Sequence, residues 1–173
     1  MNKESIKKEL SDKHNSFIDY INSLSDNDFM YTSNSAKWSA GQQLQHIYLS
    51  VRPVNIALLI PKFILNFLFG KPHQNRTYDE LVVAYQKSLL NGGKAGPQFI
   101  PKNVSIGKKN ELIDDLNQLI NSLNEKIERL SEQDLDKYML PHPLIGKISI
   151  REMLYFTIYH VQHHHKSVLE NIK

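Results

Sequence analysis

The sequence predicts an all-α protein, a four-helix bundle with a short extra helix in its long connection. Apolar residues recur at helical spacing in four long segments, and capping boxes mark two helix starts. We find no run of alternating apolar and polar residues that is convincing as a strand. Long amphipathic helices joined by loops can each bury one apolar stripe in a shared interior. We therefore expect one helical domain over residues 1–173.

The first two long helices lie in the N-terminal third. Over residues 3–24, apolar side chains alternate at helical spacing with lysines and acids; they are Ile6, Leu10, Phe17, Ile21 and Leu24. A loop over residues 25–37 leads to a second helix, which begins at a capping box formed by Ser39 and Gln42. This helix is expected to pass Pro53 with a bend.

The second half of the chain supplies the other helices. A shorter helix over residues 78–90 should end at Asn-Gly-Gly, and residues 94–109 should form an ordered surface loop. A long helix is expected over residues 111–130, where six apolar residues keep nearly a heptad spacing: Leu112, Leu116, Leu119, Leu123, Ile127 and Leu130. After a loop, a second capping box, Ser149 to Glu152, starts a last helix that extends to about Ile172.

Composition narrows the function classes. The net charge is only +3 and is spread along the chain, so nucleic-acid binding is poorly supported. The sequence has no cysteine, which excludes disulfides, thiolate metal ligands and a nucleophilic thiol. Any metal site must therefore be built from histidine, aspartate or glutamate.

Two segments bear on location. The N-terminal MNKESIKKEL is charged and lacks the apolar core of a signal peptide, so we expect a cytoplasmic protein. The apolar segment of residues 55–69 is shorter than the roughly 20 residues of a membrane span, and it contains Pro61 and Lys62. It is better interpreted as a buried or interface helix that is kinked at the proline, so no membrane association is expected.

The stretch YHVQHHHKSV places four of the eight histidines within one segment of the last helix. His160 and His164 are four residues apart, so they lie about 40° from each other on a helix and one turn apart. They could be a core histidine and its solvated neighbours, or two ligands of one ion. Burying two unpartnered imidazoles costs roughly 1–3 kcal/mol each, which favours a shared ligand. His163 and His165 point about 100° to either side of His164 and are interpreted as residues beside the site or at the surface.

A catalytic metal site usually needs a third protein ligand. His73 and His142 lie in loops beside prolines, where exposed side chains are expected. His14 lies near the apolar stripe of the first helix, and His46 lies at the flank of the second, on a stripe with Gln42, Gln43 and Ser50. From the pattern alone, His14 and His46 are nearly equal candidates, and a contribution from His163 also stays open.

Several motifs together resemble the DinB-like superfamily of metal-binding four-helix bundles. They are the Trp38-Ser39 helix start followed by His46, the loops PQFIPK and HPLIGK, and the H-x-x-H-H of the last helix. The resemblance implies an up-down-down-up bundle in which His46, His160 and His164 hold a divalent ion, often nickel or zinc. Lys166 and Ser167 stand where many relatives carry Gly-Gln. Relatives include metal-dependent hydrolases and S-transferases that use mycothiol or bacillithiol.

Two function hypotheses follow. The first is an enzyme, a metal-dependent hydrolase or thiol S-transferase, because three imidazoles on one ion leave a position open for water or a thiol. Its partner would be a small molecule, such as a low-molecular-weight thiol that arrives as co-substrate. The second is a non-catalytic binding or stress-response bundle, a homodimer built on residues 57–69, in which the metal is structural or absent.

The sequence does not identify a general base. Six side chains are plausible neighbours of the site, but each is explained more simply as a cap, a packing residue or a surface group: Gln42, Gln43, Tyr48, Glu152, Tyr155 and Tyr159. The identity of the metal also stays open, since imidazole suits zinc, nickel, copper and iron alike, and zinc and nickel are the ions that we expect first.

Overall fold

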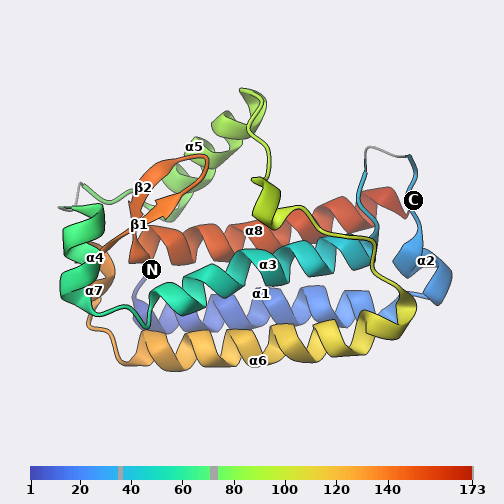
Figure 1. Cartoon of the computed structure of the whole chain (residues 1–173), viewed down its shortest axis with the longest axis horizontal. Helices are drawn as coiled ribbons and strands as arrows, with labels where there is room; N and C mark the ends of the chain where they lie inside the picture. The colour runs from blue at the N-terminus through green and yellow to red at the C-terminus, as the bar shows by residue number, and fades with distance from the viewer. Residues whose placement is uncertain (35–36, 71–73, 173) are drawn as a thin grey trace.

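The computed structural model describes residues 1–34, 37–70 and 74–172, and its long helices form the predicted four-helix bundle (Figure 1). Within these ranges the four long helices are α1 (Lys3–Ser23), α3 (Ala40–Ala57), α6 (Lys109–Glu128) and α8 (Ile150–Asn171). Helices α1 and α3 each pack against both α6 and α8. Helices α1 and α8 run in one direction and α3 and α6 in the other, which is an up-down-down-up arrangement (Figure 1).

The core lies between these four helices and is built from one apolar stripe of each. The stripe of α6 consists of Ile113, Leu116, Ile120, Leu123 and Ile127. The heptad pattern therefore predicted the helix correctly but placed its face slightly to one side, because Leu112 and Leu119 lie only at the edge of the core. A straight helix of about 3.6 residues per turn drifts away from a strict seven-residue repeat, which accounts for the rotation.

Both predicted capping boxes are present. The backbone N–H of Ser39 donates to Gln42 at 3.0 Å, and that of Ser149 donates to Glu152 at 2.8 Å. The Ser149 box is fully buried, so these bonds satisfy helix-end groups that water cannot reach. These boxes determine where α3 and α8 begin, and therefore where the histidines of each helix lie along the bundle axis.

The apolar segment after α3 is bent, as expected. Helix α3 continues past Pro53 to Ala57, and α4 (Lys62–Phe69) begins after Pro61 at an angle of 110° to α3. No single helix in the described ranges is long and apolar enough to cross a membrane, although α3 and α4 together pass that test by length and composition. Much of α4 faces outward.

The expectation of no strands was wrong. Strands β1 (Met139–His142) and β2 (Gly146–Ser149) form an antiparallel hairpin in the segment predicted as a loop, with Leu140 opposite Ile148. Strands of four residues are too short for an alternating pattern to stand out. The turn between them closes at Gly146, whose φ of 78° suits glycine.

Short helices also occur in segments predicted as loops. They are α2 (Asp26–Met30), α7 (Glu132–Lys137) and the 3₁₀ turns η1 (Pro97–Phe99) and η2 (Ile106–Lys108). The predicted helix α5 (Tyr78–Leu90) is present and begins with a further capping box, Thr77 to Glu80. Helix α5 packs on α8, and η1 packs on α3. Together with the hairpin, α5 and η1 cover the side of the bundle where α3 and α8 meet (Figure 1).

Candidate metal centre

Helices α3 and α8 bring together the three histidines that the resemblance singled out. The Nε2 atom of His160 lies 3.3 Å from Nε2 of His46 and 3.0 Å from Nε2 of His164. All three side chains are buried. Two nitrogen ligands at the usual Zn–N distance of about 2.0–2.1 Å stand about 3.3 Å apart in a tetrahedral site. The ring spacing therefore fits a group of three that could hold one metal ion.

Two of the rings are oriented by hydrogen bonds from their other nitrogen. Nδ1 of His46 lies 2.6 Å from the carbonyl oxygen of Phe99, and Nδ1 of His164 bonds the amide oxygen of Gln43. These oxygens only accept, so each Nδ1 carries the hydrogen and each Nε2 presents a lone pair. This tautomer is the one required of a ligand that binds through Nε2.

Burial keeps the rings neutral. It lowers the pKa of His160 and of His164 well below the ordinary histidine value. It also lowers the pKa of His46, although the hydrogen bond to Phe99 acts in the opposite direction and raises it. A neutral imidazole is the form that binds a metal. The three candidate ligands are thus ready at neutral pH without losing a proton.

Aromatic side chains hold the rings from both sides. Trp38 packs on His46 and His164 at ring-centroid distances of 4.8 and 6.2 Å, and Phe156 stacks on His160 at 4.7 Å. Such packing restricts ring rotation without competing for the ring nitrogens.

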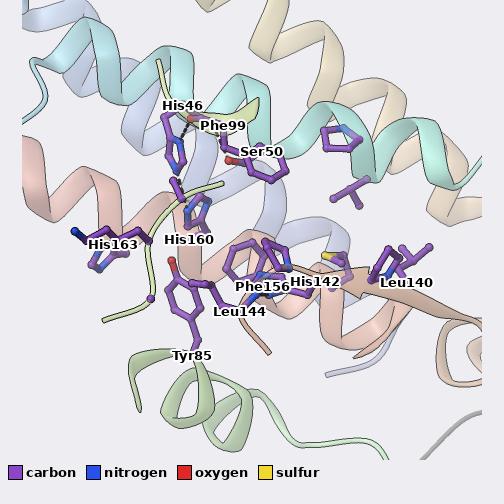
Figure 2. Close-up of a pocket in the computed structure, with 18 of the residues that line it drawn as sticks. His46, Ser50, Tyr85, Phe99, Leu140, His142, Leu144, Phe156, His160 and His163 are labelled. Carbon is purple, nitrogen blue, oxygen red and sulfur yellow. Dashed lines mark hydrogen bonds between the residues drawn. The ribbon is translucent and has the colours of Figure 1, made fainter. Parts of the chain in front are cut away.

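A cavity of about 340 Å³ opens beside the triad (Figure 2). Its walls come from α3, α5, the η1 loop, the β1–β2 hairpin and α8, and they are mainly apolar and aromatic. The lining includes Val54, Phe69, Leu89, Phe99, Leu140, Leu144, Met153 and Phe156. The space is large enough for a small organic molecule next to the three histidines.

The structure separates His46 from His14, which the sequence pattern could not. His14 is fully buried in α1, and its Nδ1 lies 2.7 Å from the carbonyl oxygen of Leu10. Burial lowers the pKa of His14 to about 4. It is a core histidine and is not one of the three clustered rings.

The remaining histidines take different places. His163 lines the cavity but lies outside the group of three, and His165 packs against Phe17 and Tyr20 at 5.8 and 5.1 Å. Of the two residues that the sequence placed beside the site or at the surface, His163 lies beside the triad, and His165 lies away from the cavity on the side of α1. His73 lies outside the described residues.

The expectation that His142 is exposed was wrong. It ends β1, is only 6% exposed and packs on Phe156 at 4.2 Å. Its Nδ1 accepts hydrogen bonds from the backbone N–H groups of Leu144 and Ile145 at 3.1 and 3.2 Å. The hairpin turn folds the ring inward, and burial lowers the pKa of His142 to about 4.

Several proposed neighbours of the site have structural roles instead. The carboxylate of Glu152 accepts from Ser149 and from the backbone of Arg76, and the hydroxyl of Tyr155 contacts Met1. Gln42 belongs to its capping box, and Tyr159 bonds Gln86 outside the cavity lining. Among these side chains, Gln43 is the one that forms a hydrogen bond with a histidine of the triad.

Sequence reasoning missed Tyr85. This α5 residue lies in the cavity wall, with its ring 6.2 Å from that of His160, and burial raises the pKa of Tyr85 to about 12. Its hydroxyl therefore stays protonated at neutral pH. The position of Tyr85 depends on how α5 packs across α8, and no motif in the sequence signals it.

The fold has a counterpart among solved structures. It matches YfiT from Bacillus subtilis, described as a probable metal-dependent hydrolase with an unusual four-helix bundle topology, with a TM-score of 0.63 and 15% identity over 97% of this chain and 84% of that one. At this identity the match shows the fold alone. A search of curated proteins gives no match.

A comparison with protein-family models identifies the family. The family model of the DinB superfamily matches residues 9–168, which include all three clustered histidines, the hairpin and Tyr85. This match spans nearly the whole chain, and the structure has the bundle and the histidine cluster that the motifs led us to expect. The protein therefore belongs to the DinB superfamily.

Proposed function

We propose that this protein is a metal-dependent enzyme, a hydrolase or thiol S-transferase, that binds one divalent ion through His46, His160 and His164. The observation that carries the proposal is the convergence of three buried imidazole rings beside a cavity, with Nε2 of His160 lying 3.3 and 3.0 Å from Nε2 of His46 and of His164. Three protein ligands leave a coordination position for water or substrate, as in catalytic zinc sites. YfiT, which shares the fold, is described as a probable metal-dependent hydrolase.

The chemistry follows from the charge of the donor set. A bound zinc or nickel ion supplies Lewis acidity, which can lower the pKa of a bound water to about 7 or bind a thiol as thiolate. The described lining contains no aspartate or glutamate, so the charge of the ion is not offset there. Phe99 and Gln43 hold the rings, and the apolar wall limits water. Because the chain has no cysteine, a thiol would come as a co-substrate.

The direct test is elemental analysis of protein purified without a tag, followed by activity assays of the loaded protein. We expect about one equivalent of zinc or nickel per chain. Hydrolysis of small-molecule esters and amides, and transfer of a low-molecular-weight thiol to an electrophile, should be assayed in parallel. A preparation that takes up no divalent metal after incubation with either ion would refute the proposal.

Gln43→Ala is expected to lower metal affinity about 10–100-fold, because it removes the acceptor that orients His164. The measurement is competition with a metal chelator of known affinity. Gln42→Ala is the matched control: it lies next along the chain but belongs to the capping box, so it should lower stability by about 1 kcal/mol and leave metal affinity unchanged. Equal metal affinities of the two variants would contradict the role of Gln43.

We also propose that two copies pair through α4. Phe63 and Phe67 on this helix are 75% and 87% exposed, and Leu59 and Leu68 are also exposed. Large exposed apolar groups next to each other are typical of protein interfaces. Phe67→Asp should convert a dimer into a monomer in sedimentation experiments, whereas Val83→Asp, at an exposed position on α5, should not. A monomeric wild-type protein would contradict this part of the proposal.

A further inference from the structure

The cavity beside the triad is suited to an uncharged ligand. Within the described lining, Lys94 is the one side chain with a permanent charge, and it is exposed at the surface. The described lining also contains no aspartate or glutamate. Away from the triad, a charged ligand group would lose its hydration without gaining a wall side chain of opposite charge. The walls therefore favour a molecule that is largely apolar.

His142 offers one fixed hydrogen-bond donor in this space. Its Nδ1 already accepts the N–H groups of Leu144 and Ile145, so it cannot carry a hydrogen itself. The neutral ring must then carry its hydrogen on Nε2. The hairpin turn thus sets the tautomer of a buried ring in the cavity wall.

Tyr85 offers a second donor. Its side chain is 5% exposed, and no acceptor for its hydroxyl is found among the described residues. The ring is held edge-on by Phe156 at 5.0 Å and His142 at 6.1 Å. In Figure 2 the hydroxyl points toward the histidine end of the cavity.

Two neutral donors in an apolar cavity indicate what the ligand must carry. A ligand that fills the cavity removes water from both donors, and each donor left without an acceptor then costs roughly 1–3 kcal/mol, so the cavity is matched to a ligand with hydrogen-bond acceptors. We propose that the substrate is a neutral, largely apolar small molecule with an acceptor such as a carbonyl oxygen, which Tyr85 and His142 recognise. This inference rests on the proposed function for the reaction at the triad, but recognition of the acceptor is independent of it.

The test uses two probes of nearly the same shape, cyclohexyl methyl ketone and isopropenylcyclohexane. The ketone has a carbonyl oxygen at the position where the alkene has a methylene group. Binding to the full chain loaded with Zn²⁺ can be followed by the fluorescence of Trp38, the sole tryptophan, which lines the cavity. We expect the ketone to bind about 3–10-fold more tightly than the alkene. Equal affinities for the wild-type protein would overturn the inference.

Variants separate the two donors from the metal. Tyr85→Phe and His142→Phe should each reduce the preference for the ketone, and the double variant should abolish it, with alkene affinity and zinc content unchanged. Tyr159→Phe is the matched control, since this hydroxyl lies outside the cavity lining. If the double variant still prefers the ketone, the carbonyl oxygen is bound by the metal ion and not by Tyr85 and His142, and the inference is wrong.

A second measurement does not depend on how His142→Phe folds. Two-bond ¹H–¹⁵N correlation spectra of the wild-type protein report the tautomer of each histidine, and His142 should carry its hydrogen on Nε2. A hydrogen on Nδ1 would overturn its role as donor.

The zinc content of the same samples distinguishes failure of this inference from failure of the enzyme proposal. A preference for the ketone in protein that binds no metal counts against the enzyme proposal alone. Stoichiometric zinc without a preference for the ketone counts against this inference alone.

Discussion

His160→Ala is expected to abolish stoichiometric metal binding while the helical bundle stays folded. His160 is the central ring of the cluster, with Nε2 within 3.3 Å of His46 and 3.0 Å of His164. Its removal leaves two nitrogens, and the loss of affinity should exceed the roughly 10–100-fold that follows removal of an outer hydrogen-bond partner. Elemental analysis measures the metal, and circular dichroism measures the helical content.

The control for His160→Ala lies in the same histidine-rich stretch. His165 packs against Phe17 and Tyr20, away from the cavity, so His165→Ala should retain the metal. If both variants keep a full equivalent of metal, the triad is not the binding site. If chelation of the metal unfolds the wild-type chain and its bound ion has no open position, the ion is structural and the non-catalytic hypothesis of the sequence analysis is favoured.

Acidification is expected to destabilise the fold through His14. In the folded state the pKa of His14 is about 4, lowered by burial, whereas an unfolded histidine titrates at 6.5. Between these pH values the unfolded chain binds more protons, so stability falls as the pH decreases from 6.5 toward 4. The full shift corresponds to about 3 kcal/mol. Urea unfolding at a series of pH values measures this loss.

His14→Leu isolates this contribution. Leucine cannot titrate, and the Nε2 atom of His14 is buried without a hydrogen-bond partner among the described residues. At neutral pH the variant should therefore match or exceed the wild-type stability. Its advantage should grow by about 3 kcal/mol on going down to pH 4. Parallel pH curves for the two proteins would contradict the prediction, and other acid-sensitive groups cancel in the comparison because both proteins share them.

The long helices were predictable because their signals are local. The capping boxes at Ser39 and Ser149 depend on residues three positions apart, and both are formed. The apolar repeat of α6 and the break at Pro61 act within a few turns of the chain. The hairpin is different, since its strands gain stability from pairing with each other and from burial of Leu140 and Ile148. The two prolines of this segment favoured the prediction of a loop.

The candidate site shows the same division. Local spacing alone placed His160 and His164 on one face of the last helix, and the motif resemblance selected His46. Periodicity left His14 equal to His46, because it reports which side of a helix is buried and not which neighbour that side faces. In the bundle His14 faces the core, and His46 faces His160.

The amino-acid pattern was thus sufficient for the all-α class, the main helix starts and the paired histidines of the last helix, since each depends on side chains within one or two turns. Packing of distant segments was needed to bury His142 against Phe156, to bring Tyr85 to the cavity and to place the Phe99 carbonyl on His46. His46 and Phe99, for example, are 53 positions apart in the chain. The geometry of such contacts depends on the angles at which whole elements pack.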